Sequence, residues 1–151
     1  MNELAKLIPE KVNFKEAITA GENFLKTLPQ LELKVFHHFA PGVYARELHI
    51  PSGVVLTGAI HKTEHLFILS AGEIEQISEH AGLERIKAPF TCISKPGAKR
   101  LGVSLTDVVV TTIHATNETS IEKLESDLVC NSYEEFEQYL ISTTKQLKEG
   151  L

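Results

Sequence analysis

Short β-rich stretches follow one another through the middle of the chain, and this pattern restricts the fold more than any other feature of the sequence. They are rich in Val, Ile, Thr and Phe, and cover residues 43–50, 54–60, 65–70, 73–80, 83–88, 90–94, 101–105 and 107–115. Turn-forming residues such as Pro41-Gly42, Ala71-Gly72 and Pro96-Gly97 separate many of them. Roughly eight strands without helices between them are typical of an antiparallel sandwich or barrel. We therefore expect an all-β fold and not a parallel α/β sheet.

A helical pattern precedes this region. Asn13, followed three residues later by Glu16, resembles a capping box at the start of a helix. Apolar residues then recur at helical spacing until Gly21, which interrupts the pattern. A second short helical stretch covers residues 22–28 and ends at Pro29, because proline cannot continue a helix.

Helical patterns return after Asn117. Apolar residues spaced three and four apart predict one helix near residues 121–128. Ser132 and Glu135 resemble another capping box. The apolar stripe of the helix that follows contains Phe136, Tyr139, Leu140 and Leu147. We expect this stripe to pack on the barrel, with a dimer contact as the alternative.

The length of 151 residues predicts a single domain spanning residues 1–151. Its parts are a helical or irregular segment over 1–35, a jelly-roll barrel over 36–116 and C-terminal helices over 117–151. With 42% hydrophobic and 23% charged residues, the chain can form an ordinary folded core.

Charge and hydropathy argue against several classes of partner. The 15 Lys and Arg residues are outnumbered by 20 Asp and Glu and form no cluster, so we expect no nucleic-acid binding. No apolar run approaches the roughly 18 residues of a membrane span, and no signal peptide is visible at the start. The two cysteines, Cys92 and Cys130, lack CxxC spacing, which favours reduced thiols and a cytoplasmic location.

Two of the seven histidines, His61 and His65, lie in the segment HKTEH, which matches the H-x-x-E-H pattern of inverted zinc proteases. That pattern requires a helix, on which residues four apart share one face. The flanking segments GVVLTGAI and LFILSAGEI are β-branched and contain glycine, so they do not favour a helix. A protease of this class is therefore not expected.

A turn between two strands is the geometry that brings these histidines together. In one unbroken strand His61 and His65 would stand about 13 Å apart, at a rise of ~3.3 Å per residue. A single metal ion with ligands at about 2.1 Å cannot join them over that distance. A turn at residues 62–64 would aim both rings inward, and His114, late in another expected strand, is the best-placed third ligand. The alternative is that these are polar side chains satisfied by backbone groups or water.

Further residues are candidates for ligand binding. Arg100 and the adjacent Lys99 follow a Pro-Gly turn, where a guanidinium group could bind a carboxylate or a phosphate. A surface salt bridge is the alternative. Glu64 lies in the expected turn between the two histidines and could replace His65 as a metal ligand, or it could be solvated.

The stretch 43–50 carries four more candidate residues. Tyr44 and Arg46 share one face of the expected strand, and Glu47 and His49 share the other. Only one of these pairs can therefore face the interior of a barrel. His37 and His38 are given no role.

Over residues 41–115 the chain resembles the cupin superfamily. The segment GVVLTGAIHKTEHLFILSAGEI is similar to the first cupin motif, G…HxHxxxxExxxVLxGE, and ISKPGAKRLGV is similar to the second, PxGxxH. Aligned on Gly72, His65 stands where the family has its metal-binding Glu, and His61 near the second His of the motif. Ala59 falls near the first His, and Arg100 replaces the His of the second motif. The resemblance implies a jelly-roll fold and the use of His114 as a compensating ligand.

A closer similarity is to small single-domain cupin-like proteins of bacteriophages and bacteria. It is carried by the segments HHFAPGVYARELHIPSGVVLTGAIHKTEH, PGAKRLGV and TTIHATNET. Most members of that group have no assigned activity, so this resemblance concerns the fold. It also implies a homodimer, because such barrels commonly pair through an edge strand or exchanged terminal segments.

Two functional hypotheses follow. The first is a small-molecule binding cupin that holds Zn, Fe, Ni or Mn through neutral imidazoles and binds an anionic carboxylate, phosphate or sugar-phosphate-like ligand. If it is an enzyme, Glu47 or Glu64 is the candidate base. The second is a metal-free, non-catalytic module that sequesters or senses a ligand or serves in an assembly. The missing histidines at Ala59 and Arg100 favour the second hypothesis over a standard dioxygenase.

Overall fold

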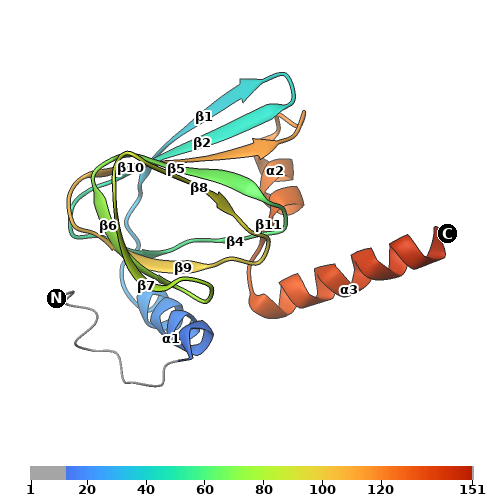
Figure 1. Ribbon diagram of the computed structural model, residues 1–151, viewed down its shortest axis with the longest axis horizontal. Helices are drawn as coiled ribbons and strands as arrows, with labels where there is room; N and C mark the ends of the chain where they lie inside the picture. Colours follow the sequence, from blue (N-terminus) through green and yellow to red (C-terminus); the bar gives the residue numbers. More distant parts are fainter. Residues whose placement is uncertain (1–12, 151) are drawn as a thin grey trace.

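A computed structural model gives the structure of residues 13–150, which form a β-barrel accompanied by helices (Figure 1). The elements are α1 (Phe14–Lys26), β1 (Lys34–Ala40), β2 (Val43–Ile50), β3 (Val55–Thr57), β4 (Ile60–His61), β5 (His65–Ala71), β6 (Glu73–Ser78), β7 (Gly82–Lys87), β8 (Phe90–Ser94), β9 (Arg100–Ser104), β10 (Val108–Ala115), α2 (Ile121–Leu128), β11 (Val129–Cys130) and α3 (Tyr133–Glu149). Helix α1 packs on strands β3, β6 and β9.

Two antiparallel sheets form the wall of the barrel. The first has five strands in the order β1-β2-β10-β5-β8, and the second has four in the order β3-β9-β6-β7. A short ladder of β4 and β11 joins the C-terminal region to the barrel. All of these pairings are antiparallel, which confirms the all-β jelly-roll fold with N- and C-terminal helices.

The main core lies between the two sheets. Its buried residues are Ile50, Phe67, Leu69, Ile74, Ile86, Val108 and Val110. Alternate residues of a strand point to the same side, so the inward side of β10 continues from Val108 and Val110 to Thr112 and His114. The alternation that places Val108 and Val110 in the apolar core therefore also places His114 inside the barrel.

The predicted break at Gly21 is wrong. Helix α1 continues through this residue to Lys26, beginning at Asn13, whose side chain accepts a hydrogen bond from the Glu16 amide as expected. A Cβ atom added to Gly21 would lie 2.8 Å from a methyl carbon of Leu101 on β9. Gly21 therefore permits close packing of the helix on the sheet and does not end the helix.

Strand β1 is a second correction, because part of it was expected to belong to a helical or irregular segment. Residues 34–40 pair over their whole length with β2, from Lys34 opposite His49 to Ala40 opposite Val43. Gly42 has a φ of +74°, which only glycine adopts easily, and so allows the tight turn between these strands. The stretch 54–60 also differs from expectation, since it divides into β3 and β4.

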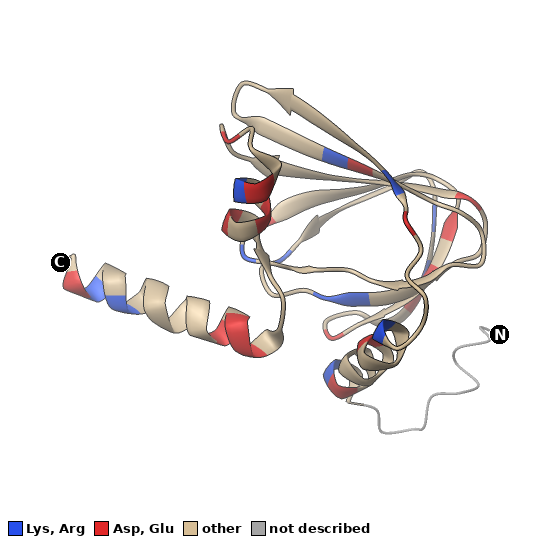
Figure 2. Ribbon diagram, turned by 180° about the vertical axis from the view of Figure 1, so that it is seen from behind, with Lys and Arg blue, Asp and Glu red and all other residues tan. Residues whose placement is uncertain are grey.

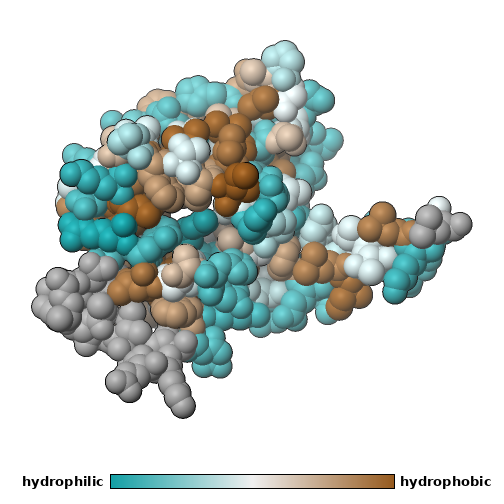
Figure 3. Space-filling model, viewed as in Figure 1, coloured by the Kyte–Doolittle hydropathy of each residue, from teal (hydrophilic) through white to brown (hydrophobic). Residues whose placement is uncertain are grey.

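Both C-terminal helices begin where the sequence predicts them. Ser120 caps α2, and Ser132 caps α3 by accepting a hydrogen bond from the Glu135 amide. The first turn of α3 lies against the barrel, where the Phe136 ring packs over Gly97. The rest of α3 projects away from the barrel (Figure 1). Apolar side chains remain exposed along it (Figure 3). The apolar stripe therefore packs on the barrel only in part.

Charged residues of both signs lie on each of the three helices (Figure 2). No helix among residues 13–150 is long and apolar enough to cross a bilayer. Cys92 and Cys130 are both free thiols, as expected.

Candidate metal centre

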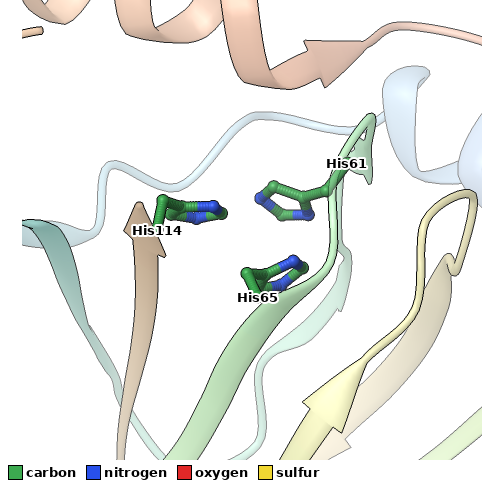
Figure 4. A group of neighbouring side chains, drawn as sticks. All are labelled: His61, His65 and His114. Atoms are coloured by element: carbon green, nitrogen blue, oxygen red, sulfur yellow. The ribbon is translucent and has the colours of Figure 1, made fainter. Parts of the chain in front are cut away.

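Three histidines from three strands face one another inside the barrel (Figure 4). His61 ends β4, the chain turns over residues 62–64, and His65 begins β5. His114 lies near the end of β10, which pairs directly with β5. The turn that the sequence predicts between His61 and His65 is therefore present, and it brings both rings to the same place as His114.

The three rings are close enough to share one ion. Their centroids are separated by 4.2 Å for His61 and His65, 5.0 Å for His61 and His114, and 4.6 Å for His65 and His114. One ring nitrogen from each histidine lies within 4.8 Å of the other two. Metal–imidazole bonds are about 2.1 Å long, so nitrogens separated by distances of this order could bind one ion lying between them.

All three imidazoles are held in the neutral form. Burial and the neighbouring His65 and His114 rings lower the pKa of His61 to about 3. Burial and the neighbouring His65 ring lower the pKa of His114 to about 4. Burial likewise lowers the pKa of His65, against the opposing effect of its hydrogen bond to Thr63. A neutral imidazole has the free lone pair that a metal requires.

Hydrogen bonding leaves ring nitrogens available at this site. His65 donates from Nδ1 to the carbonyl oxygen of Thr63 at 3.1 Å, which leaves its Nε2 as the acceptor atom. His114 Nδ1 is buried and has no hydrogen-bond partner among the described residues. A buried nitrogen without a partner is unfavourable, and a metal ion would satisfy it. The donor set therefore fits a divalent transition metal.

A cavity of about 880 Å³ extends from the histidines between the two sheets. Its polar wall residues, besides the three histidines, include Tyr44, Arg46, Gln76, Arg100 and Thr112. Its apolar wall residues include Leu33, Leu48, Ile50, Leu56, Phe67, Ile74 and Val110. This volume is in the usual range of about 300–1,000 Å³ for small-molecule sites.

Tyr44 and Arg46 are the pair of strand β2 that faces the cavity. The Tyr44 ring stacks on His114, with centroids 6.1 Å apart, and its hydroxyl is hydrogen-bonded to His37 Nδ1 at 2.7 Å. Burial raises the pKa of Tyr44. No role was assigned to His37 from the sequence, although a hairpin turn at Pro41-Gly42 would have predicted its position. A two-residue turn there pairs His37 with Arg46 and places both on the cavity side.

Two arginines enter the cavity from opposite sheets, Arg46 from β2 and Arg100 from β9. Arg100 donates a hydrogen bond to the Ser94 hydroxyl at 3.0 Å, and its guanidinium lies 5.1 Å from the centre of the Phe67 ring. Neither arginine takes part in an ion pair within residues 13–150. Both positive charges are therefore available to an anionic ligand.

The structure places Glu47, His49 and Glu64 away from the cavity. Glu47 and His49 lie on the outer face of β2, because neighbouring strand residues alternate, and they are hydrogen-bonded to each other at 2.6 Å. Glu64 lies in the exposed turn and pairs with Lys95 at 3.0 Å. Neither glutamate is therefore positioned as the base for chemistry in the barrel.

Lys99 also lies away from the cavity. It precedes Arg100, so its side chain points to the opposite side of the chain, where it forms an ion pair with Glu22 of α1. Only 6% of the Lys99 side chain is exposed. Of the two residues expected to bind an anionic ligand, only Arg100 lies in the cavity, whereas Lys99 lies at the interface with α1.

No protein-family model matches this chain, and no curated protein matches it. Several solved structures are similar to it. The Cnp3 cupin domain of Schizosaccharomyces pombe is 20% identical, with a TM-score of 0.47 over 68% of this chain and 71% of that domain. A conserved protein of Klebsiella pneumoniae with a double-stranded β-helix domain is 14% identical, with a TM-score of 0.49 over 75% of this chain and 95% of its own. An RmlC-like cupin family protein of Methanocaldococcus jannaschii is 13% identical, with a TM-score of 0.47 over 57% of this chain and 82% of its own. These similarities concern the fold alone.

Proposed function

We propose that this cupin-like barrel binds one divalent transition-metal ion through His61, His65 and His114 and holds a small anionic molecule beside it. The observation that carries this proposal is the convergence of three neutral imidazoles whose ligating atoms lie within 4.8 Å of one another. The buried His114 Nδ1, which has no partner in the described part of the chain, supports it independently. Neutral nitrogen ligands suit Zn, Fe, Ni or Mn.

Arg46 and Arg100 support the choice of an anionic ligand. A guanidinium group offers a planar fork of N–H donors that matches the two oxygens of a carboxylate or phosphate. Both groups lie in the cavity wall, and neither forms an ion pair within the part of the chain that the structure describes. They would orient the charged end of the ligand next to the histidines.

When bound, a metal ion would supply Lewis-acid chemistry at the ligand or activate water or oxygen. The side chains of the barrel would bind and orient the ligand and limit the access of water. The Tyr44 hydroxyl, which is hydrogen-bonded to His37, is placed to hold a proton beside His114. It takes the place of Glu47 and Glu64 as the candidate proton-holding group.

A second candidate function is binding of the anionic molecule without a metal. Two substitutions relative to the cupin motifs favour it, since Ala59 and Arg100 stand where the motifs have histidine. Both residues line the cavity. In this case Arg46 and Arg100 would bind the ligand, and the histidines would serve as neutral polar groups of the wall.

Metal content separates the two candidates. Purified protein is analysed for transition metals alongside the variants His61→Ala and His114→Ala, with His80→Ala at an exposed turn as the matched control. The metal proposal predicts about one ion per chain in the wild type and in His80→Ala, and a loss in the other two variants. If the protein contains no metal even after incubation with Zn²⁺, Fe²⁺, Ni²⁺ and Mn²⁺, the metal proposal is wrong and the metal-free function is favoured.

A homodimer, a cytoplasmic location and an origin in the phage group stay predictions, and the last two rest on the sequence alone. The homodimer has some support in α3, where Ile141 and Leu147 are 60% and 68% exposed. Light scattering on the purified protein tests it. A mass of twice the chain supports the dimer, and a mass of one chain contradicts it.

A further inference from the structure

We infer that the ligand of this cavity has an anionic head group, a carboxylate or a phosphate, on an extended apolar body, and is not a sugar phosphate. Its head group would lie between Arg46 and Arg100, next to the three histidines. Its apolar body would extend along the barrel over the aliphatic part of the wall. This inference rests on the proposed function for the location of the site, and it adds the chemical class of the ligand.

The first argument is the order of side chains along the five-stranded sheet. On β2 the cavity residues follow one another as Tyr44, Arg46, Leu48 and Ile50. On β10 the order that starts from His114 is Thr112 and then Val110. The register places Arg46 opposite Thr112 and Leu48 opposite Val110. Along these two strands the cavity wall is therefore polar at the histidine end and becomes apolar in the same direction.

The facing sheet repeats this order. Arg100 of β9 lies opposite Ser78 of β6, and the next cavity residue of β6, Gln76, lies opposite Gly102. Beyond Gln76 the wall of β6 continues with Ile74, which belongs to the apolar core. Both sheets thus place their arginine near the histidines and their aliphatic residues farther along.

Gly102 adds space at the level where the wall changes from polar to apolar. A Cβ atom at this position would lie 3.3 Å from atoms of Ile74, Glu75 and Gln76, which is tighter than ordinary contact. Gly102 lines the cavity here and contributes no side chain that would fill the space between the arginine level and the aliphatic level. A ligand can extend past this position with its head group still at the arginines.

The second argument is charge. Arg46 and Arg100 bring two positive charges into a cavity whose histidines are neutral. The acidic residues of the wall are Glu122, Glu125 and Glu135, from α2 and α3, and none of them forms an ion pair with either arginine. Arg46 is exposed and Arg100 is half-buried, and an anionic head group in the cavity is a partner that both guanidinium groups could bind.

The third argument is that the part of the ligand lying in the aliphatic region of the cavity is not rich in hydroxyl groups. Leu48, Ile50, Leu56, Ile74 and Val110 offer no side-chain hydrogen bonds to a ligand in the aliphatic part of the cavity. Each sugar hydroxyl buried there would lose its hydrogen bonds to water without replacement. An alkyl or aryl body gains from the same surroundings, because apolar surface leaves water.

Calorimetric titration of the zinc-loaded full chain with a set of matched probes tests the inference. Octanoate is compared with hexanoate, with the neutral 1-octanol, with octyl phosphate and with glucose 6-phosphate. We expect octanoate to bind at least ten-fold more tightly than 1-octanol. We also expect each methylene group between hexanoate and octanoate to tighten binding roughly three- to four-fold, the increment for burying one such group. Tighter binding of glucose 6-phosphate, or affinity that does not depend on chain length, would overturn the apolar body. The relative affinities of octanoate and octyl phosphate distinguish the two head groups, and binding of neither would overturn the anionic head.

Arginine variants test the location of the head group. Arg46→Gln and Arg100→Gln are expected to weaken octanoate binding at least ten-fold and to leave 1-octanol binding unchanged. Arg85→Gln is the matched control, because Arg85 pairs with Glu73 outside the cavity. Arg46→Lys keeps the charge but not the planar fork, and its octanoate affinity should fall between wild type and Arg46→Gln. Unchanged octanoate affinity in both cavity variants would overturn the inference.

Metal content measured on the same samples keeps the two proposals apart. The arginine variants should retain the zinc of the wild type, which also shows that they are folded. If the wild type holds no metal but octanoate still binds through the arginines, the metal proposal fails and the ligand class stands. If zinc is bound and neither octanoate nor octyl phosphate is, the ligand class fails and the metal centre stands.

Discussion

The imidazole rings of His65 and His114 lie 4.6 Å apart on neighbouring antiparallel strands. The pairing of Ile113 with Leu66 fixes this relationship, because His114 and His65 are the next residues along the two strands. Both histidines are buried. The register of β5 and β10 therefore places two potential nitrogen ligands next to each other. His61 reaches the same place through the turn at residues 62–64.

Acid should destabilise the metal-free protein through these histidines. His61 has a pKa of about 3 when folded, well below its ordinary value of 6.5. The unfolded chain therefore binds protons first as the pH falls below 6.5, and the free energy of unfolding falls with it. His61→Gln removes one of these groups, so its free energy of unfolding should fall less steeply between pH 6.5 and pH 4. Denaturant unfolding in the presence of a chelator measures both curves, and parallel curves would contradict the expectation.

Breaking the Lys99–Glu22 ion pair should be costly. Burial opposes ionisation of Glu22, but hydrogen bonds and charges from Lys99 and Lys26 outweigh it and lower the pKa of this carboxyl. Glu22→Gln leaves the buried Lys99 ammonium without its counter-charge, and we expect a loss of at least about 2 kcal/mol in the free energy of unfolding at pH 7. The control is Glu149→Gln, whose exposed partner is Lys145, with an expected loss below about 0.5 kcal/mol.

The pH dependence gives a second check on this pair. Since the pKa of Glu22 is lowered in the folded state, its stabilising effect is present above the ordinary value of 4.5 and is lost as the pH falls through the lowered value. The difference between wild type and Glu22→Gln should therefore shrink in acid. A difference that is the same at pH 7 and pH 3 would argue against an electrostatic origin.

Gly72 should tolerate no side chain. It joins β5 to β6 with a φ of +85°, and a Cβ atom would lie 2.1 Å from the carbonyl oxygen of Asp107. Gly72→Ala is expected to lower the free energy of unfolding by more than about 2 kcal/mol, from backbone strain and the clash together. Gly53→Ala has a similar φ of +81° but nothing within 4 Å, so it should cost only about 1 kcal/mol. Equal losses in thermal or denaturant unfolding would contradict this account.

The Tyr44–His37 hydrogen bond should contribute to stability separately from metal binding. Tyr44→Phe keeps the ring stacked on His114 and removes the hydroxyl, so the free energy of unfolding should fall by about 1 kcal/mol with metal content unchanged. A double-mutant cycle with His37→Ala measures the coupling between the two side chains. A coupling energy near zero would mean that the bond does not contribute.

Local chemistry explains the parts of the fold that the sequence predicted. Turn-forming residues divided most strands correctly, and Asn13 and Ser132 marked helix starts because capping is a contact between near neighbours. The distance argument for His61 and His65 needed only the geometry of a strand. The convergence of His114 with them was also predicted, because its place late in a β-rich stretch was visible.

The parts that were missed depend on contacts between distant segments. Gly21 looks like a helix breaker until α1 is seen to pack on Leu101. Strand β1 contains Lys34 and two adjacent histidines, and its pattern does not alternate clearly between polar and apolar residues. The side of β2 that faces the cavity was left open, and packing of the two sheets decides it. Lys99 was misplaced because its partner, Glu22, lies far away in the chain.

X-ray absorption spectroscopy of the zinc-loaded protein tests the central claim most directly. The account predicts about three imidazole nitrogens at ~2.0–2.1 Å from the ion, with oxygen completing the shell. His114→Ala should reduce the imidazole number by one or abolish binding, while His80→Ala should reproduce the wild-type spectrum. A shell with fewer than two imidazoles, or one containing sulfur, would contradict a metal centre built from His61, His65 and His114.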